Sequence, residues 1–224
     1  MLYLLLIISA PIGLIYVPST LIVPGDATAT AEHIRASEWL FRIGIGSEMF
    51  HQTIAIFLVL ALYRLFKRVN EQHAKLLVIL GALVSVPIVF INVVNEIAAL
   101  ILVNGADFLS VFSKSQLDAL ALLFLRLHER GIEIVGIFWG LWLFPYGILV
   151  IRSGFIPRLL GVLLFIAGTG LLASSFTSLL LPQYGHLFGQ IATVLDIGEF
   201  PTIFWFFIRA LWPPRITEPE RTSS

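Results

Sequence analysis

Long apolar stretches alternate with short polar ones along the whole chain, and this pattern predicts helices that cross a membrane. One crossing takes about 20 predominantly apolar residues, because the hydrocarbon layer is about 30 Å thick. The pattern predicts an all-α integral membrane bundle of about six transmembrane helices, forming a single domain over 1–212 with a polar tail over 213–224. The predicted spans are at about 1–17, 38–66, 74–103, 132–151, 159–181 and 191–212.

Two local signals refine these elements. Asp26 stands where an N-cap is expected, and it predicts a short helix over 27–36. The apolar stretch 117–151 is too long for one upright crossing, and charged residues and Gly131 interrupt it. We therefore predict an extra interfacial helix at about 117–130, a break near Gly131 and the fourth span beyond it.

Basic side chains indicate the orientation. They gather in three places: between the second and third spans, between the fourth and fifth, and at the C-terminal end. These places share one side if the N-terminus is inside, so the excess of Lys and Arg predicts that both termini are cytoplasmic and that the protein is multi-pass in the cell membrane. The residues concerned are Arg64, Lys67, Arg68 and Lys75, then Arg152 and Arg158, then Arg209, Arg215 and Arg221.

The composition supports lipid as the surrounding solvent. Of the 224 residues, 58% are hydrophobic and 12% are charged, whereas soluble domains carry about 25% charged residues. The chain has 14 Lys and Arg residues and 14 Asp and Glu residues, so its formal net charge is zero. Without a basic stripe, nucleic acid is not an expected partner. The absence of Cys excludes disulfides, thiolate metal ligands and a Cys nucleophile.

Ionisable residues inside membrane spans are costly, so each invites a functional interpretation. With the predicted orientation, the acidic and imidazole groups fall in the outer half of the bundle, while the inner half is nearly all apolar. This asymmetry predicts a polar cavity that opens toward the outside. The candidate cavity-lining residues are Arg42, Glu48, His51, Asn95, Glu96, His128, Glu133, Asp196 and Glu199.

A metal site is one interpretation of this set. Glu48 and His51 are three residues apart, hence on one helix face, as in the metal centres of helical bundles. His128 is the third candidate ligand, and Glu96 or Glu199 could complete the site. The sequence identifies neither the metal nor any other cofactor.

Three functions remain open. The first is binding or transport of a small or lipidic molecule, which predicts that Glu48, Glu96 and Glu199 face one connected cavity. The second is an enzyme using carboxylate and His acid–base or metal chemistry on a lipid or isoprenoid, which predicts a His within hydrogen-bond reach of a carboxylate. The third is a structural or interaction protein without a ligand, in which each charge meets a partner, as Arg42 could meet Glu38 and Glu133 could meet Arg130.

Small residues predict where helices approach closely. Gly136, Gly140 and Gly147 form a seam on the fourth span, and small residues at a spacing of four let helices pack tightly in lipid. Packing within one chain is favoured over a dimer interface.

Several segments carry a resemblance to a known family. The most specific are Pro24-Gly-Asp-Ala27 and the turn Arg152-Ser-Gly-Phe-Ile-Pro-Arg158, and others are Leu40-Phe-Arg-Ile-Gly44, Leu120-Ala-Leu-Leu-Phe-Leu125 with His128, and Ile197-Gly-Glu199. Across nearly its whole length the chain resembles an uncharacterised bacterial multi-pass membrane protein family, domain of unknown function 4386. The resemblance implies a bacterial inner-membrane protein with several helices, and it implies no particular reaction or ligand. Arg42, His128 and Glu199 fall within matching segments.

Overall fold

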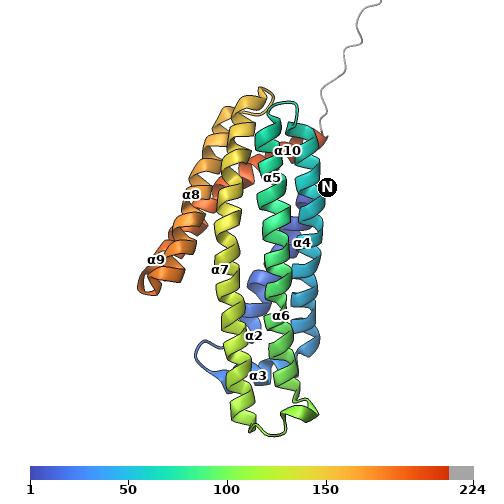
Figure 1. Ribbon diagram of the computed structural model, residues 1–224, viewed down its shortest axis with the longest axis vertical. Coiled ribbons are helices and arrows are strands. Elements are labelled where there is room, and N and C mark those ends of the chain that lie inside the picture. The colour runs from blue at the N-terminus through green and yellow to red at the C-terminus, as the bar shows by residue number, and fades with distance from the viewer. Residues whose placement is uncertain (212–224) are drawn as a thin grey trace, which may run out of the picture.

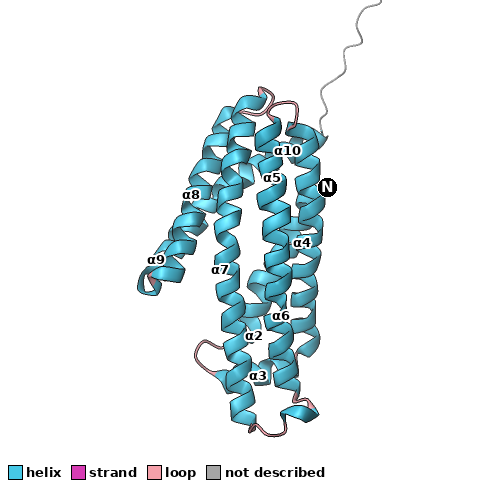
Figure 2. Cartoon of the chain, viewed as in Figure 1, coloured by secondary structure: helices cyan, strands magenta, loops and turns pink. Residues whose placement is uncertain are grey.

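The protein is an all-helical bundle, as the hydropathy pattern predicts (Figures 1 and 2). The computed structural model describes residues 1–211, without the side chains of residues 186, 192–194, 196–197 and 210–211. Five helices among these residues are long and apolar enough to cross a membrane, and the apolar segment Phe200–Arg209 is shorter. The chain is therefore an all-α membrane protein. Its orientation stays a prediction.

The first crossing helix is built from three consecutive segments: α1 (Leu2–Pro11), the π-helix η1 (Ile12–Tyr16) and α2 (Val17–Leu21). It extends past Pro18, beyond the end predicted at about residue 17. Pro18 lies near the start of α2 and has no N–H to donate to the preceding turn. The π-helix η1 covers the turn just before Pro18. The carbonyl groups of that turn would accept the hydrogen bond that a proline cannot donate, and the wider π-helical turn accommodates this.

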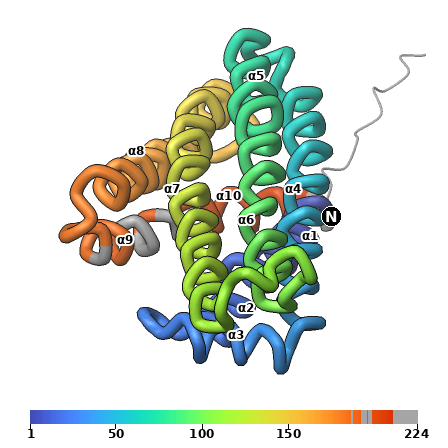
Figure 3. Tube along the Cα trace, turned by 60° about the horizontal axis from the view of Figure 1, so that its bottom comes forward, coloured from blue at the N-terminus to red at the C-terminus, as the bar shows by residue number. Residues whose placement is uncertain are grey.

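Asp26 caps the next helix, as predicted. Its Oδ1 accepts a hydrogen bond of 2.9 Å from the N–H of Ala29, and α3 (Ala27–Ala36) follows. α3 lies across one end of the bundle (Figure 3). α4 (Glu38–Phe66) has the bounds of the predicted second helix.

α5 (Glu71–Val78), the π-helix η2 (Ile79–Val84) and α6 (Ser85–Asn104) form the next continuous crossing. Asn70 caps its start by accepting a 3.0 Å hydrogen bond from the N–H of His73. A short 3-10 turn, η3 (Asp107–Leu109), then leads to α7.

One continuous helix, α7 (Lys114–Ser153), replaces the predicted interfacial helix over 117–130 and the predicted break near Gly131. A capping box between Ser113 and Gln116 starts it. A glycine in a helix interior costs only about 1 kcal/mol relative to alanine. That cost is small beside the contact with α6 that Gly131 permits, so the helix passes through it unbroken.

The C-terminal part also differs from the predicted elements. α8 (Arg158–Leu180) is followed by α9 (Pro182–Asp196), the 3-10 turn η4 (Ile197–Glu199) and α10 (Phe200–Leu211). The range 191–212, predicted as one span, is thus divided at η4, and residue 212 lies outside the described residues. Pro182 can start α9 at once because a helix tolerates proline in its first turn. Pro201 similarly favours a new helix start after η4.

The glycine seam lies between α7 and α8 of the same chain, so it serves packing within one chain, as the sequence analysis favours over a dimer interface. A Cβ on Gly147 would lie 2.8 Å from the Gly161 carbonyl oxygen, and one on Gly140 would lie 3.0 Å from that of Gly168. These backbones approach too closely for any larger residue. Gly136 instead faces Ser175 on α8.

Two apolar clusters fill the bundle at different levels. One joins α2, α3 and the adjoining ends of α4, α6 and α7, and includes Ile34, Phe41 and Leu117. The other joins the opposite ends of α4 and α7 with α5 and α8, and includes Phe66, Leu77 and Leu149. Along both α4 and α7, the polar residues discussed next lie between members of these two clusters.

Candidate functional site

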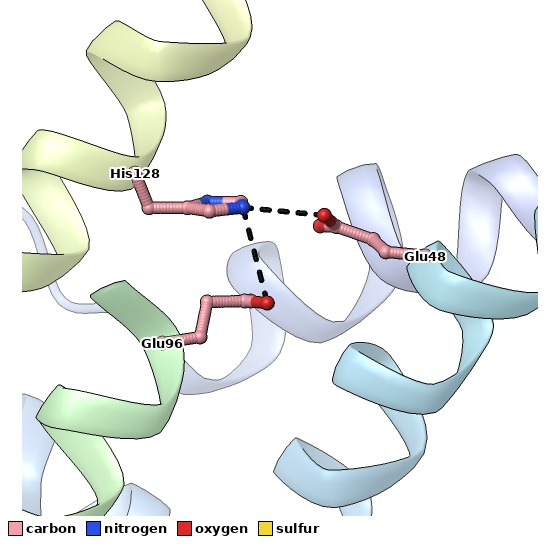
Figure 4. A group of neighbouring side chains, drawn as sticks. All are labelled: Glu48, Glu96 and His128. Atoms are coloured by element: carbon pink, nitrogen blue, oxygen red, sulfur yellow. Dashed lines mark hydrogen bonds and ion pairs between the residues drawn. The ribbon is translucent and has the colours of Figure 1, made fainter. Parts of the chain in front are cut away.

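Glu48 on α4, Glu96 on α6 and His128 on α7 point toward one another inside the bundle (Figure 4). His128 Nε2 lies 3.2 Å from Glu48 Oε2 and 3.8 Å from Glu96 Oε2. The exposed fractions of the three residues are 4%, 5% and 9%. One ligand atom from each of the three lies within 4.8 Å of the others. We call these three residues the carboxylate–histidine cluster.

The cluster leaves two carboxylate oxygen atoms without a hydrogen bond. Glu48 Oε1 and Glu96 Oε2 are buried and accept no hydrogen bond. Among the described residues 1–211, the carboxylates of Glu48 and Glu96 each form an ion pair with His128, and neither forms one with an Arg or a Lys. Burying an uncompensated charge is expensive, so this arrangement needs a proton or a cation among the three side chains. The geometry can therefore support proton exchange between imidazole and carboxylate, or the binding of a cation.

Asn92 on α6 fixes the backbone that carries His128. Its Nδ2 donates a 2.9 Å hydrogen bond to the His128 carbonyl oxygen, and its Oδ1 accepts one of 3.0 Å from Asn95 Nδ2. Gly131 makes this approach possible, because a Cβ there would overlap Asn92 Oδ1. Gly13 has a similar role beside Glu48, since a Cβ on it would lie 2.7 Å from Glu48 Cγ.

His51 does not join the cluster, although it lies one helical turn from Glu48. Its Nδ1 lies 3.2 Å from Ser9 Oγ on α1. His51 instead borders two hollows. A small one of about 10 Å³, at the lower limit of the space that holds one water molecule, is lined by Glu48 and Ile132 together with His51.

A much larger cavity of about 590 Å³ adjoins the small hollow, and both are lined by His51, Gln52 and Trp139. Its wall comes from α1, η1, α4, η2, α7, α8, η4 and α10 and is mostly apolar. Both π-helices contribute, through Leu14 and Gly81. The large cavity is thus apolar rather than polar. No residue of the carboxylate–histidine cluster lines it, and Glu48 of the cluster lines the small hollow.

The other predicted site residues lie in different places. Arg42 is exposed and pairs with Glu38 at 2.7 Å, and Glu133 pairs with Arg130 at 2.8 Å on the surface of α7. Glu199 lines the large cavity. The side chain of Asp196 lies outside the described residues.

Two features of the interior escaped the sequence analysis. Asp118, 1% exposed, receives a hydrogen bond from Arg35 on α3. Its spacing from the apolar positions Ala121 and Leu125 on the same face of α7 is the signal that could have shown its burial. Trp142 lines the large cavity, and its Nε1 is buried without an acceptor.

These observations define a polytopic all-α membrane protein with a buried carboxylate–histidine cluster beside an apolar cavity. The chain belongs to the family described as a domain of unknown function (DUF4386), whose model matches residues 1–210. An uncharacterized protein of Archaeoglobus fulgidus is 36% identical over 73 residues, which are 33% of this chain and 42% of that protein. The match thus spans less than half of that relative. No solved structure matches the chain.

Proposed function

We propose that the protein binds a lipidic molecule in the large cavity, either to hold it or to carry it across the membrane. The observation that supports this is the cavity volume of about 590 Å³, within the range of about 300–1,000 Å³ that is usual for ligand pockets. Its lining is dominated by apolar side chains from α1, α4 and α10, such as Leu6, Leu58 and Ile203. The proposal includes a multi-pass position in the cell membrane with both termini cytoplasmic.

The polar groups in the wall indicate the chemistry of the ligand. The polar residues Glu199, His51 and Gln52 line the cavity. An apolar chain fits the wall, and a polar group at one end of the ligand could hydrogen-bond to these side chains. π-helices are frequent at functional sites, and here two of them border one cavity.

Native mass spectrometry of the protein released in mild detergent tests this proposal. We expect a lipid adduct on the unaltered chain and its loss in Ala55→Phe, which fills the cavity from α4. Ala61→Phe is the matched control, because Ala61 is on the same helix and exposed. A bare mass for the unaltered chain, or an adduct that survives Ala55→Phe, would contradict the proposal.

A membrane-embedded enzyme is the second candidate, favoured by one specific contact. The 3.2 Å between His128 Nε2 and Glu48 Oε2 is within reach for proton transfer. Glu48 lines the small hollow, and the small hollow shares His51, Gln52 and Trp139 with the large cavity. Incubation of the purified protein with total membrane lipids should then give a converted lipid by mass spectrometry. The conversion should be lost in His128→Gln and kept in Glu129→Gln. Absence of any converted lipid excludes this candidate for those lipids.

A further inference from the structure

We propose that Glu48, Glu96 and His128 form a binding site for one divalent metal ion of the Zn²⁺ or Mn²⁺ type. The proposal does not rest on lipid binding in the large cavity, because none of these three residues lines that cavity. The ligand set also differs from the one the sequence suggested, since Glu96 takes the place of His51.

The geometry of the three side chains suits a metal ion. Zn²⁺ binds carboxylate oxygen and imidazole nitrogen at about 2.0–2.2 Å, so tetrahedral ligand atoms are about 3.4 Å apart. The two distances from His128 Nε2 are 3.2 and 3.8 Å, on either side of that value. Small side-chain rotations therefore suffice to coordinate an ion between helices α4, α6 and α7.

The charge of the cluster is compatible with a bound cation. With both carboxylates ionised and the imidazole neutral, the cluster would carry two negative charges inside a bundle that is apolar above and below it. A divalent ion would neutralise both. Glu48 Oε1 and Glu96 Oε2, on residues that are 4% and 5% exposed, are buried without a hydrogen bond. Buried oxygen atoms without partners are uncommon, and coordination would satisfy them.

The ligand types narrow the choice of metal. One imidazole and two carboxylates suit Zn²⁺, Mn²⁺ or Fe²⁺, whereas soft metals need the sulfur ligands that this Cys-free chain lacks. Three protein ligands leave a fourth coordination position, as in catalytic zinc sites. The hollow of about 10 Å³ that Glu48 lines is at the lower limit of the space that holds one water molecule.

The surrounding residues hold the ligands in position. The hydrogen bond from Asn92 Nδ2 to the His128 carbonyl oxygen joins two of the three ligand-bearing helices. Asn92 is one turn before Glu96 on α6, so a single helix face carries both a ligand and the group that positions another ligand. Such support keeps the ligands close when no ion is present.

Metal analysis of the purified protein after dialysis against Zn²⁺ or Mn²⁺, and then against metal-free buffer, tests the site. We expect about one ion per chain, and at least a tenfold loss of affinity in Glu96→Gln and His128→Ala. His51→Ala and Glu133→Gln should retain the ion, because His51 faces Ser9 and Glu133 pairs with Arg130. No bound ion, or equal binding by Glu96→Gln and the unaltered chain, would overturn the proposal.

Variants of a buried residue can fail to fold, so a second measurement uses the unaltered chain. Titration with Co²⁺ should saturate at one equivalent and give visible absorption bands of a low-symmetry site with a nitrogen ligand. Excess Zn²⁺ should abolish these bands. A titration without a saturating band overturns the proposal. The lipid adduct is measured in a separate experiment, so failure to bind a metal ion and failure to bind a lipid can be distinguished.

Discussion

Arg35 on α3 donates a hydrogen bond to the carboxylate of Asp118 on α7, a residue 83 positions further along the chain. Arg35 Nε also donates to the Val103 carbonyl oxygen, at 2.8 Å. One guanidinium thus ties α3 to the end of α6 and to α7. Asp118 is 1% exposed, so its charge depends on this partner.

Replacing Arg35 with Ala should therefore destabilise the bundle. Removing one partner of a buried ion pair costs about 3–5 kcal/mol, and the partial exposure of Arg35 should bring the loss toward the lower end. Thermal unfolding in detergent measures it. Lys114→Ala is the matched control, because Lys114 and Glu32 link the same two helices with side chains that are 63% and 59% exposed. That control should change stability little, and an equal loss in both variants would refute the prediction.

Gly131→Ala should separate α6 from α7. Alanine normally stabilises a helix interior by about 1 kcal/mol relative to glycine, but here its Cβ would overlap Asn92 Oδ1. Overpacking costs typically about 1–3 kcal/mol, so we expect a net loss and a weaker hydrogen bond from Asn92 to the His128 backbone. Thermal unfolding checks the sign. Gly46→Ala, where a Cβ meets nothing within 4 Å, should be neutral or stabilising.

Tyr3 and Tyr146 should show energetic coupling between α1 and α7. Their hydroxyl oxygens are 2.9 Å apart, and Tyr146 is buried. Tyr146→Phe leaves the other hydroxyl without this partner, at a cost of about 1–3 kcal/mol. Tyr3→Phe combined with Tyr146→Phe should then cost less than the sum of the single changes. Strictly additive losses in unfolding measurements would show that the contact contributes nothing.

The predicted orientation can be measured by labelling, because the chain contains no Cys. With both termini cytoplasmic, Val111→Cys, in the exposed loop before α7, should react with an impermeant maleimide in intact cells. Arg68→Cys, in the turn between α4 and α5, should react only after the membrane is permeabilised. The reverse pattern would invert the orientation.

Hydropathy predicts the crossing helices because contact with lipid requires apolar side chains along a whole stretch. The predicted end of a helix within 117–130 is wrong, because the charged residues Arg126, Glu129 and Arg130 suggest an interruption that the helix does not have. In the structure Arg126 and Arg130 pair with Glu129 and Glu133 on the exposed face of α7, and the helix continues beneath them. Charge alone shows where a helix meets a polar environment, and it does not show where the helix ends.

The candidate site could be predicted from the sequence only in part. Burial cost identifies Glu48, Glu96 and His128 as unusual residues within spans, but sequence spacing favours His51 as the neighbour of Glu48. The choice between His51 and Glu96 depends on how α4, α6 and α7 rotate against each other. Gly13 and Gly131 set that packing through close approaches that no local pattern shows.

The length of α7 places the carboxylate–histidine cluster relative to the bilayer. Its 40 residues rise about 60 Å. Even at a tilt of about 40° they extend about 45 Å along the bilayer normal, against a hydrocarbon layer of about 30 Å. The excess falls at the end that carries α3, because α8, joined to the other end by a short turn, has only 23 residues. His128 lies 14 residues after Lys114, about 21 Å along the helix. The cluster is thus within a few helical turns of the headgroups, and an ion from the aqueous phase would reach it without crossing the bilayer centre.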